Sequence, residues 1–145
     1  MQSKGAGMEI SGSCYCNAVQ LKVNGAPKSV VNCHCNLCRK QSGAAFSTYV
    51  AVPEEAFEII SGADSLASFP IGEDAQKHFC KQCGTPLFNK NPRYPGLCII
   101  YLGAIADSSN LIPTANIYCD SQLSWVPSIA ELRAFPQGIV RRSEK

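Results

Sequence analysis

The chain has little charge of either sign and no long apolar run. Its 13 Lys and Arg residues against 11 Asp and Glu residues give a formal net charge of +2, and the cations are scattered. A nucleic-acid-binding domain usually carries a strongly basic stripe, so the charge argues against DNA or RNA as a partner. No segment approaches the roughly 20 apolar residues that cross a bilayer, which argues against a membrane protein.

Signals for secretion and for several domains are also missing. Residues 1–7 lack the apolar core of a secretory signal, so a cytoplasmic, reducing location is expected. No internal repeat or interdomain linker is evident, and 145 residues are enough to bury one core. We therefore expect a single domain over 1–145, with mobile tails at 1–7 and 139–145.

Long amphipathic helices are absent, and short strand-like segments recur along most of the chain. Strands are expected at 8–12, 19–23, 29–33, 45–52, 57–60, 66–69, 76–80, 85–88, 97–102 and 114–119. A helical turn is expected at 36–42, ended by Gly43, and a short helix near 53–56. The Asn- and Pro-rich segment 89–96 is expected to be a loop. This pattern predicts an all-β or β-dominated fold with little helix.

Cysteine, in contrast, is abundant. Seven of the nine cysteines fall in C-x-C or C-x-x-C spacings. Disulfide frameworks usually link distant positions, and cysteines crowded in this way cannot all bridge one another without strain. In a chain without a secretion signal, such spacing indicates metal binding rather than disulfides.

Two of the cysteine pairs together predict a closed metal site. Cys80 and Cys83 form a zinc knuckle followed by Gly84, which can adopt a backbone conformation closed to other residues. One knuckle supplies two ligands, and Cys14 and Cys16 are the pair that can complete the set. The alternative is that these are buried cysteines acting as small apolar residues.

The central cluster supplies three further thiols. Cys33 and Cys35 would face one point if the strand continued through them, and a tight turn at 36–37 would bring Cys38 to the same point. Three protein ligands with an exchangeable fourth position are the pattern of catalytic zinc. The alternatives are that no metal binds there, or that a fourth protein ligand closes the site; the candidates are Cys98, Cys119, His34 and His78.

Each of these four has a simpler interpretation. Cys98 and Cys119 lie in apolar strand segments, where a free cysteine is typically a small core residue. An extended backbone would turn His34 away from the metal of its neighbours, so it would either line a pocket as an acid or base or lie on the surface. His78 is interpreted as structural.

Three blocks of sequence carry a resemblance to a known family. They are GSCYC at 12–16, CHCNLCRKQSGAAF at 33–46 and FCKQCGTPL at 79–87. Together they resemble the glutathione-dependent formaldehyde-activating enzyme family, which includes centromere protein V-like proteins. The blocks span most of residues 10–90.

The resemblance implies a fold, two metal sites and an activity. The fold would be several short coiled antiparallel β-sheets around the cysteine knuckles. A structural zinc would bind Cys14, Cys16, Cys80 and Cys83, and a second zinc would bind Cys33, Cys35 and Cys38. The family's named activity joins formaldehyde and glutathione into S-hydroxymethylglutathione, which is a carbon–sulfur lyase reaction in reverse.

The leading hypothesis is therefore a zinc-dependent, carbon–sulfur lyase-type enzyme that acts on a thiol–aldehyde adduct. Cys33, Cys35 and Cys38 would hold the catalytic metal. Arg39 and Lys40 would lower the thiol pKa values and attract a peptide carboxylate such as that of glutathione, or they would simply be an exposed cationic pair.

Two other functions remain open at this point. One is a non-catalytic zinc module that binds a protein or nucleic acid, and the other is a thiol or metal sensor that uses the central thiols. Trp125, the only tryptophan, is interpreted as a pocket wall, an interface anchor or neither.

Overall fold

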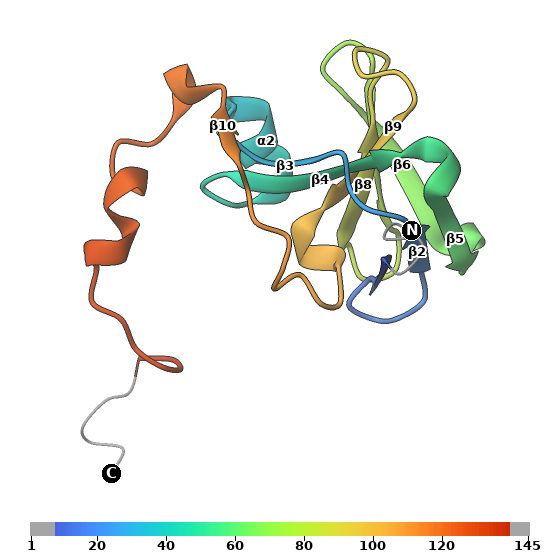
Figure 1. Cartoon of the computed structure of the whole chain (residues 1–145), viewed down its shortest axis with the longest axis horizontal. Helices are drawn as coiled ribbons and strands as arrows, with labels where there is room; N and C mark the ends of the chain where they lie inside the picture. The colour runs from blue at the N-terminus through green and yellow to red at the C-terminus, as the bar shows by residue number, and fades with distance from the viewer. Residues whose placement is uncertain (1–7, 140–145) are drawn as a thin grey trace.

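Two β-sheets and a C-terminal segment make up the computed structural model, which describes residues 8–139 (Figure 1). The smaller sheet has three antiparallel strands in the order β1-β2-β5. These strands are β1 (Glu9–Ser13), β2 (Gln20–Asn24) and β5 (Phe57–Ser61). The segment that connects β2 to β5 in sequence contributes two strands to the larger sheet.

The larger sheet has seven strands in the order β10-β3-β4-β9-β8-β7-β6. Their bounds are β3 (Ser29–Cys33), β4 (Ser47–Pro53), β6 (Leu66–Ile71), β7 (Ala75–Cys80), β8 (Pro86–Lys90), β9 (Leu97–Tyr101) and β10 (Ala115–Ile117). All neighbours are antiparallel except β10 and β3, which are parallel.

Among residues 8–139, helical structure is limited to short segments. The α-helix there is α2 (Asn36–Ser42), and the 3-10 turns are η1 (Glu54–Ala56), η2 (Ala63–Ser65), η3 (Leu102–Ala104), η4 (Cys119–Ser121) and η5 (Val126–Glu131). The predicted β-dominated fold is confirmed. The resemblance implied several coiled sheets, and the described residues form two. Within 8–139, no helix has the length and apolarity to cross a bilayer.

Several expected boundaries are corrected. The strand expected at 45–52 begins at Ser47 and includes Pro53. The loop expected at 89–96 is shorter, because Asn89 and Lys90 still pair with β7. The expected tails at 1–7 and 139–145 lie outside the described residues, except for Ile139.

The two faces of the larger sheet have different partners. Side chains alternate between the faces along a strand, so Val50 and Val52 of β4 enter the main core, which the smaller sheet completes with Leu21 and Val23. Tyr49 points the other way, into a small apolar cluster with Cys33 and Tyr101. The face that does not carry the main core is therefore the one that meets α2 and the central cysteines.

Helix α2 begins and ends with specific caps. Cys35 is the N-cap, and its sulfur accepts a hydrogen bond from the backbone N–H of Cys38. Gly43 ends the helix with φ 75°, a left-handed conformation that glycine adopts without the steric cost of a Cβ. Because Cys35 is the N-cap, the helix begins three residues after the end of β3 at Cys33.

A close backbone approach joins the smaller sheet to η3. Gly12 of β1 bridges to Ile105, and a Cβ at Gly12 would overlap the carbonyl oxygen of Ala104. Gly103 has no atom within 4 Å of the corresponding position. The two glycines therefore form a matched pair for testing this contact.

We expect Gly12→Ala to lower the free energy of unfolding by about 1–3 kcal/mol, because the added methyl must displace backbone atoms. Gly103→Ala should change it by less than about 0.5 kcal/mol. Urea unfolding followed by circular dichroism measures both variants. Equal effects at the two positions would contradict the packing described here.

Candidate functional site

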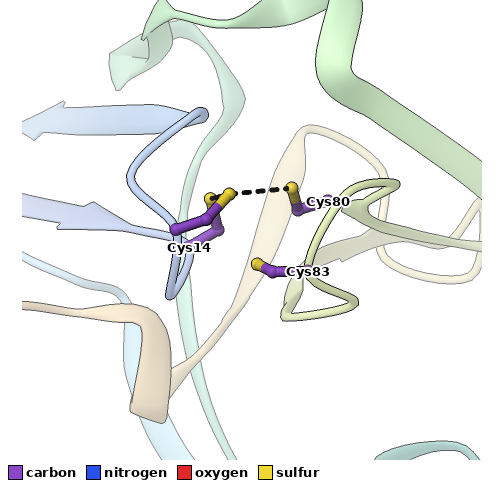
Figure 2. A group of neighbouring side chains, drawn as sticks. Cys14, Cys80 and Cys83 are labelled. Carbon is purple, nitrogen blue, oxygen red and sulfur yellow. Dashed lines mark hydrogen bonds between the residues drawn. The ribbon is translucent and has the colours of Figure 1, made fainter.

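Two turns distant in sequence bring four cysteines together. Cys14 and Cys16 follow β1, Cys80 ends β7, and Cys83 lies in the turn that leads to β8. The four sulfurs all lie within 4.8 Å of one another. Figure 2 shows the sulfurs of Cys14, Cys80 and Cys83 facing a common point between the two turns.

The spacing of this four-cysteine group suits a tetrahedral metal. Cys16 Sγ lies 3.6 Å from Cys14 Sγ and 3.8 Å from Cys80 Sγ. Zinc–sulfur bonds of about 2.3 Å in a tetrahedron would separate the sulfurs by about 3.8 Å. The group could therefore hold a metal ion without a large rearrangement.

The surrounding backbone supports negative charge on these sulfurs. The N–H of Val19 donates to Cys14 Sγ at 3.3 Å, and the N–H of Gln82 donates to Cys80 Sγ at 3.4 Å. The side-chain hydroxyl of Thr85, 3.2 Å from Cys83 Sγ, is the main cause that lowers the pKa of Cys83 to about 5. Hydrogen bonds of this kind favour the thiolate, which is the form that binds metal.

A second group consists of Cys33, Cys35 and Cys38, whose sulfurs also lie within 4.8 Å of one another. Cys33 Sγ and Cys38 Sγ are 3.2 Å apart. The predicted meeting of the three thiols occurs, but the expected strand geometry is wrong. Strand β3 ends at Cys33, Cys35 is the N-cap of α2, and Cys38 lies in the first helical turn.

Within residues 8–139, no further Cys, His, Asp or Glu joins this three-cysteine group. The two groups therefore differ in the number of possible metal ligands, four in one and three in the other. A three-thiol group leaves one vertex of a tetrahedron open to a water or a substrate atom.

The neighbouring thiol, rather than the cationic pair, dominates the charge state of the three-cysteine group. The hydrogen bond between Cys33 and Cys38 is the main cause that lowers the pKa of Cys33 to about 6, and it raises the pKa of Cys38. Arg39 has a structural role, since its guanidinium donates to the carbonyl oxygens of His34 and Ser121 at 2.8 and 2.5 Å. It also contacts the Asn36 side chain. Neither Arg39 nor Lys40 is among the main causes of the pKa shift of Cys33.

A hydrogen-bonded chain behind Cys38 was not predicted from the sequence. The hydroxyl of Tyr49 donates to Cys38 Sγ at 3.2 Å, and the amide of Gln41 donates to the Tyr49 hydroxyl at 3.2 Å. The hydroxyl of Tyr101 is 2.6 Å from Gln41 Oε1 and donates to it. The helical spacing of Gln41, one turn after Cys38, is the sequence signal that could have indicated its involvement.

The two extra cysteines lie apart from both groups. Cys98 is fully buried in the main core, as expected, and burial raises the pKa of its thiol to about 12. Cys119 was expected to be a core residue, but it is exposed in η4. The prediction failed because β10 ends at Ile117, before Cys119.

Neither histidine joins a cysteine group. His34 is buried, so the surface interpretation is wrong; its ring packs on Phe46 at 5.0 Å and its Nε2 lies 3.3 Å from Asn116 Oδ1. His78 stacks on Phe88 with ring centroids 4.4 Å apart, and burial lowers the pKa of its imidazole. Both environments are those of packed side chains.

Comparison with known proteins identifies several relatives of this chain. Two relatives, from Aspergillus flavus and Aspergillus oryzae, are each 36% identical over 92 residues, which is 61% of this chain and 48% of theirs. A relative from Halomonas elongata is 27% identical over 127 residues, covering 82% of this chain and 80% of that protein. All three carry the provisional name glutathione-dependent formaldehyde-activating enzyme.

The chain spans about half the length of the Aspergillus relatives. Among solved structures, a Rhodobacter sphaeroides protein superposes with a TM-score of 0.59 at 18% identity, covering 73% of this chain and 98% of that one. This likeness shows a shared fold.

The family model described as glutathione-dependent formaldehyde-activating enzyme matches residues 9–121, a span that contains both cysteine groups. The chain therefore belongs to the glutathione-dependent formaldehyde-activating enzyme family.

Proposed function

We propose that the protein is a zinc-dependent, carbon–sulfur lyase-type enzyme acting on a thiol–aldehyde adduct. The observation that carries the proposal is the difference between a four-thiol group and a three-thiol group in one chain. Cys14, Cys16, Cys80 and Cys83 would hold a structural zinc. Cys33, Cys35 and Cys38 would hold a second zinc whose fourth position is open to substrate.

The substrates proposed are glutathione and formaldehyde, as the names of the relatives suggest. In the synthetic direction, the thiol sulfur forms a bond to the aldehyde carbon, and the thiol proton ends on the former carbonyl oxygen. Zinc at the three-cysteine group would supply a Lewis acid for this addition.

The chain's own residues would position the reactants. Capping by Cys35 and the short helix α2 keep the three thiols on one side of the β3–α2 junction. Lys40, exposed on the next turn of α2, is available to attract a peptide carboxylate. Arg39 is already occupied by two backbone carbonyls, so the carboxylate role that was expected for the pair falls to Lys40.

Tyr49 would act as a positioning residue for Cys38. Its hydroxyl is oriented by Gln41 and donates to the sulfur. Groups that hydrogen-bond a metal ligand fix its orientation, and their loss typically weakens metal binding 10- to 100-fold, on the order of 1–3 kcal/mol. This buried contact therefore supports a metal at the three-cysteine group.

We expect Cys35→Ser to lose one zinc per chain and all thiol–aldehyde turnover while it keeps the wild-type circular dichroism spectrum. Cys80→Ser should unfold the protein, because the four-cysteine group joins the two sheets. Cys119→Ser is the matched control, since Cys119 is exposed and lies outside both groups. It should retain metal, fold and activity.

Full turnover by Cys35→Ser would contradict the assignment of the three-cysteine group as catalytic. A folded Cys80→Ser variant with unchanged zinc content would contradict the structural role of the four-cysteine group. Wild-type protein that holds both metals but shows no thiol–aldehyde turnover would favour a non-catalytic zinc module.

We expect Tyr49→Phe to weaken zinc binding at the three-cysteine group between about 10- and 100-fold, since the sulfur of Cys38 loses its hydrogen bond. Competition with a chromophoric chelator measures the affinity. Tyr15→Phe serves as the control, because Tyr15 is 90% exposed. If both variants bound zinc as the wild type does, Tyr49 would have no positioning role.

A further inference from the structure

The C-terminal arm, residues 122–139, is apolar and exposed. Every residue from 127 to 139 is exposed. Five large apolar side chains on the arm remain uncovered: Trp125 at 49%, Ile129 at 44%, Leu132 at 61%, Phe135 at 40% and Ile139 at 80%. Soluble monomers rarely expose several large apolar side chains close together in sequence unless they serve an interaction.

The arm has a defined local structure. Backbone hydrogen bonds of 3.1 Å join Val126 to Leu123 and Leu132 to Ile129 within and around η5. The Arg133 guanidinium lies 5.0 Å from the centroid of the Phe135 ring. The arm therefore has regular local turns around η5.

The base of the arm is attached to the region of the three-cysteine group. The His34 N–H donates to the Ile117 carbonyl at 3.0 Å, and Arg39 of α2 donates to the Ser121 carbonyl. Beyond this anchor, the hydrogen bonds found for residues 123–139 are internal to the arm. Figure 1 shows the arm leaving the body near α2 and β10 and extending away from both sheets.

The body of the protein carries an apolar groove of similar character. The groove lies between α2 and strands β6 and β7, with a volume of ≈ 460 Å³. Its walls include the apolar side chains of Leu37, Phe69, Ile71 and Phe79. Leu37 is 54% exposed and Phe69 is 63% exposed, so the groove is open to a partner.

The groove is lined by positive charge, and the arm carries one acidic side chain. The charged residues lining the groove are Lys40 and Lys77, with no acidic residue among them. Between residues 122 and 139, the charged residues are Glu131, which lies between Ile129 and Leu132, and Arg133. Lys77 already donates to the Gln41 carbonyl at 2.6 Å and lies over the Phe79 ring, so Lys40 is the groove cation that Glu131 of the arm can approach.

We propose that the arm of each chain docks in the groove of a second copy, so that two chains exchange arms about a two-fold axis. Each copy carries both the arm and the groove, which is the requirement for a closed, reciprocal pair. The arm runs away from its own body, so a second copy is the partner that it can reach without leaving its anchor. A net charge of +2 does not oppose this association.

Arm exchange would also extend the site. Three residues of α2 line the groove: Leu37, Lys40 and Gln41. Gln41 also belongs to the hydrogen-bonded chain behind Cys38. The arm of one copy would then form a wall beside the three-cysteine group of the other. This inference does not depend on the metal content or on the reaction proposed above.

The first test uses the full chain and its single tryptophan. Sedimentation velocity should show a dimer that dissociates on dilution, and the emission maximum of Trp125 should shift to the red with the same midpoint. A monomer at all concentrations would overturn the proposal. A blue-shifted emission without concentration dependence would mean that the arm folds onto its own body, and it would also overturn it.

The second test uses charged substitutions at exposed positions, where unfolding is not expected. Leu132→Asp on the arm and Phe69→Asp in the groove should each raise the dimer dissociation constant at least roughly 30-fold, as loss of an interface hot spot does. Ile112→Asp is the control, because Ile112 is 64% exposed and lies outside the arm and the groove. It should leave the dissociation constant unchanged.

Mixing the two variants distinguishes arm–groove docking from pairing between arms. A mixed dimer of Leu132→Asp with Phe69→Asp contains one intact arm facing one intact groove, so equal amounts should associate more tightly than either variant alone. No gain on mixing would overturn the arm–groove contact. An Ile112→Asp effect as large as those of the two variants would overturn it as well.

Discussion

The four-cysteine group is the constraint on which the rest of the structure depends. It brings Cys16 and Cys80, which are 64 residues apart in sequence, to a sulfur–sulfur distance of 3.8 Å. This contact holds the end of the smaller sheet against the β7–β8 turn of the larger one, over a core that both sheets share. With one face of the larger sheet committed in this way, its other face is left to carry α2 and the three central cysteines.

That second face holds a three-thiol group that could bind a metal and leave one position open. Cys33 ends a paired strand, Cys35 caps a helix, and Cys38 is hydrogen-bonded by Tyr49. The three sulfurs are thus held by regular structure, as a preformed ligand set requires. A tetrahedral metal bound by three thiols would have its fourth vertex left for substrate. The four-cysteine and three-cysteine groups together account for seven of the nine cysteines; under the proposed function, the first would support the fold and the second the chemistry.

Local patterns predicted much of this arrangement. The cysteine spacings indicated both groups, and β3 and α2 with its Gly43 cap have the predicted bounds, because strand alternation and helix capping depend on neighbouring residues. The sequence did not indicate what depends on tertiary packing. The burial of His34 against Phe46, the binding of Arg39 to the Ser121 carbonyl and the chain from Tyr101 to Cys38 join residues that only the folded sheet brings together. Cys119 was assigned to the core because nothing local marks the end of β10.

X-ray absorption at the zinc edge, on protein purified without added metal, tests the central claim most directly. The account predicts two zinc ions per chain, with an average of three to four sulfur neighbours and an additional oxygen or nitrogen neighbour at about 2.0 Å. This oxygen or nitrogen atom would occupy the fourth position of the zinc bound at the three-cysteine group. One zinc per chain with four sulfur neighbours and no lighter one would contradict the account, since only the closed site would then bind metal.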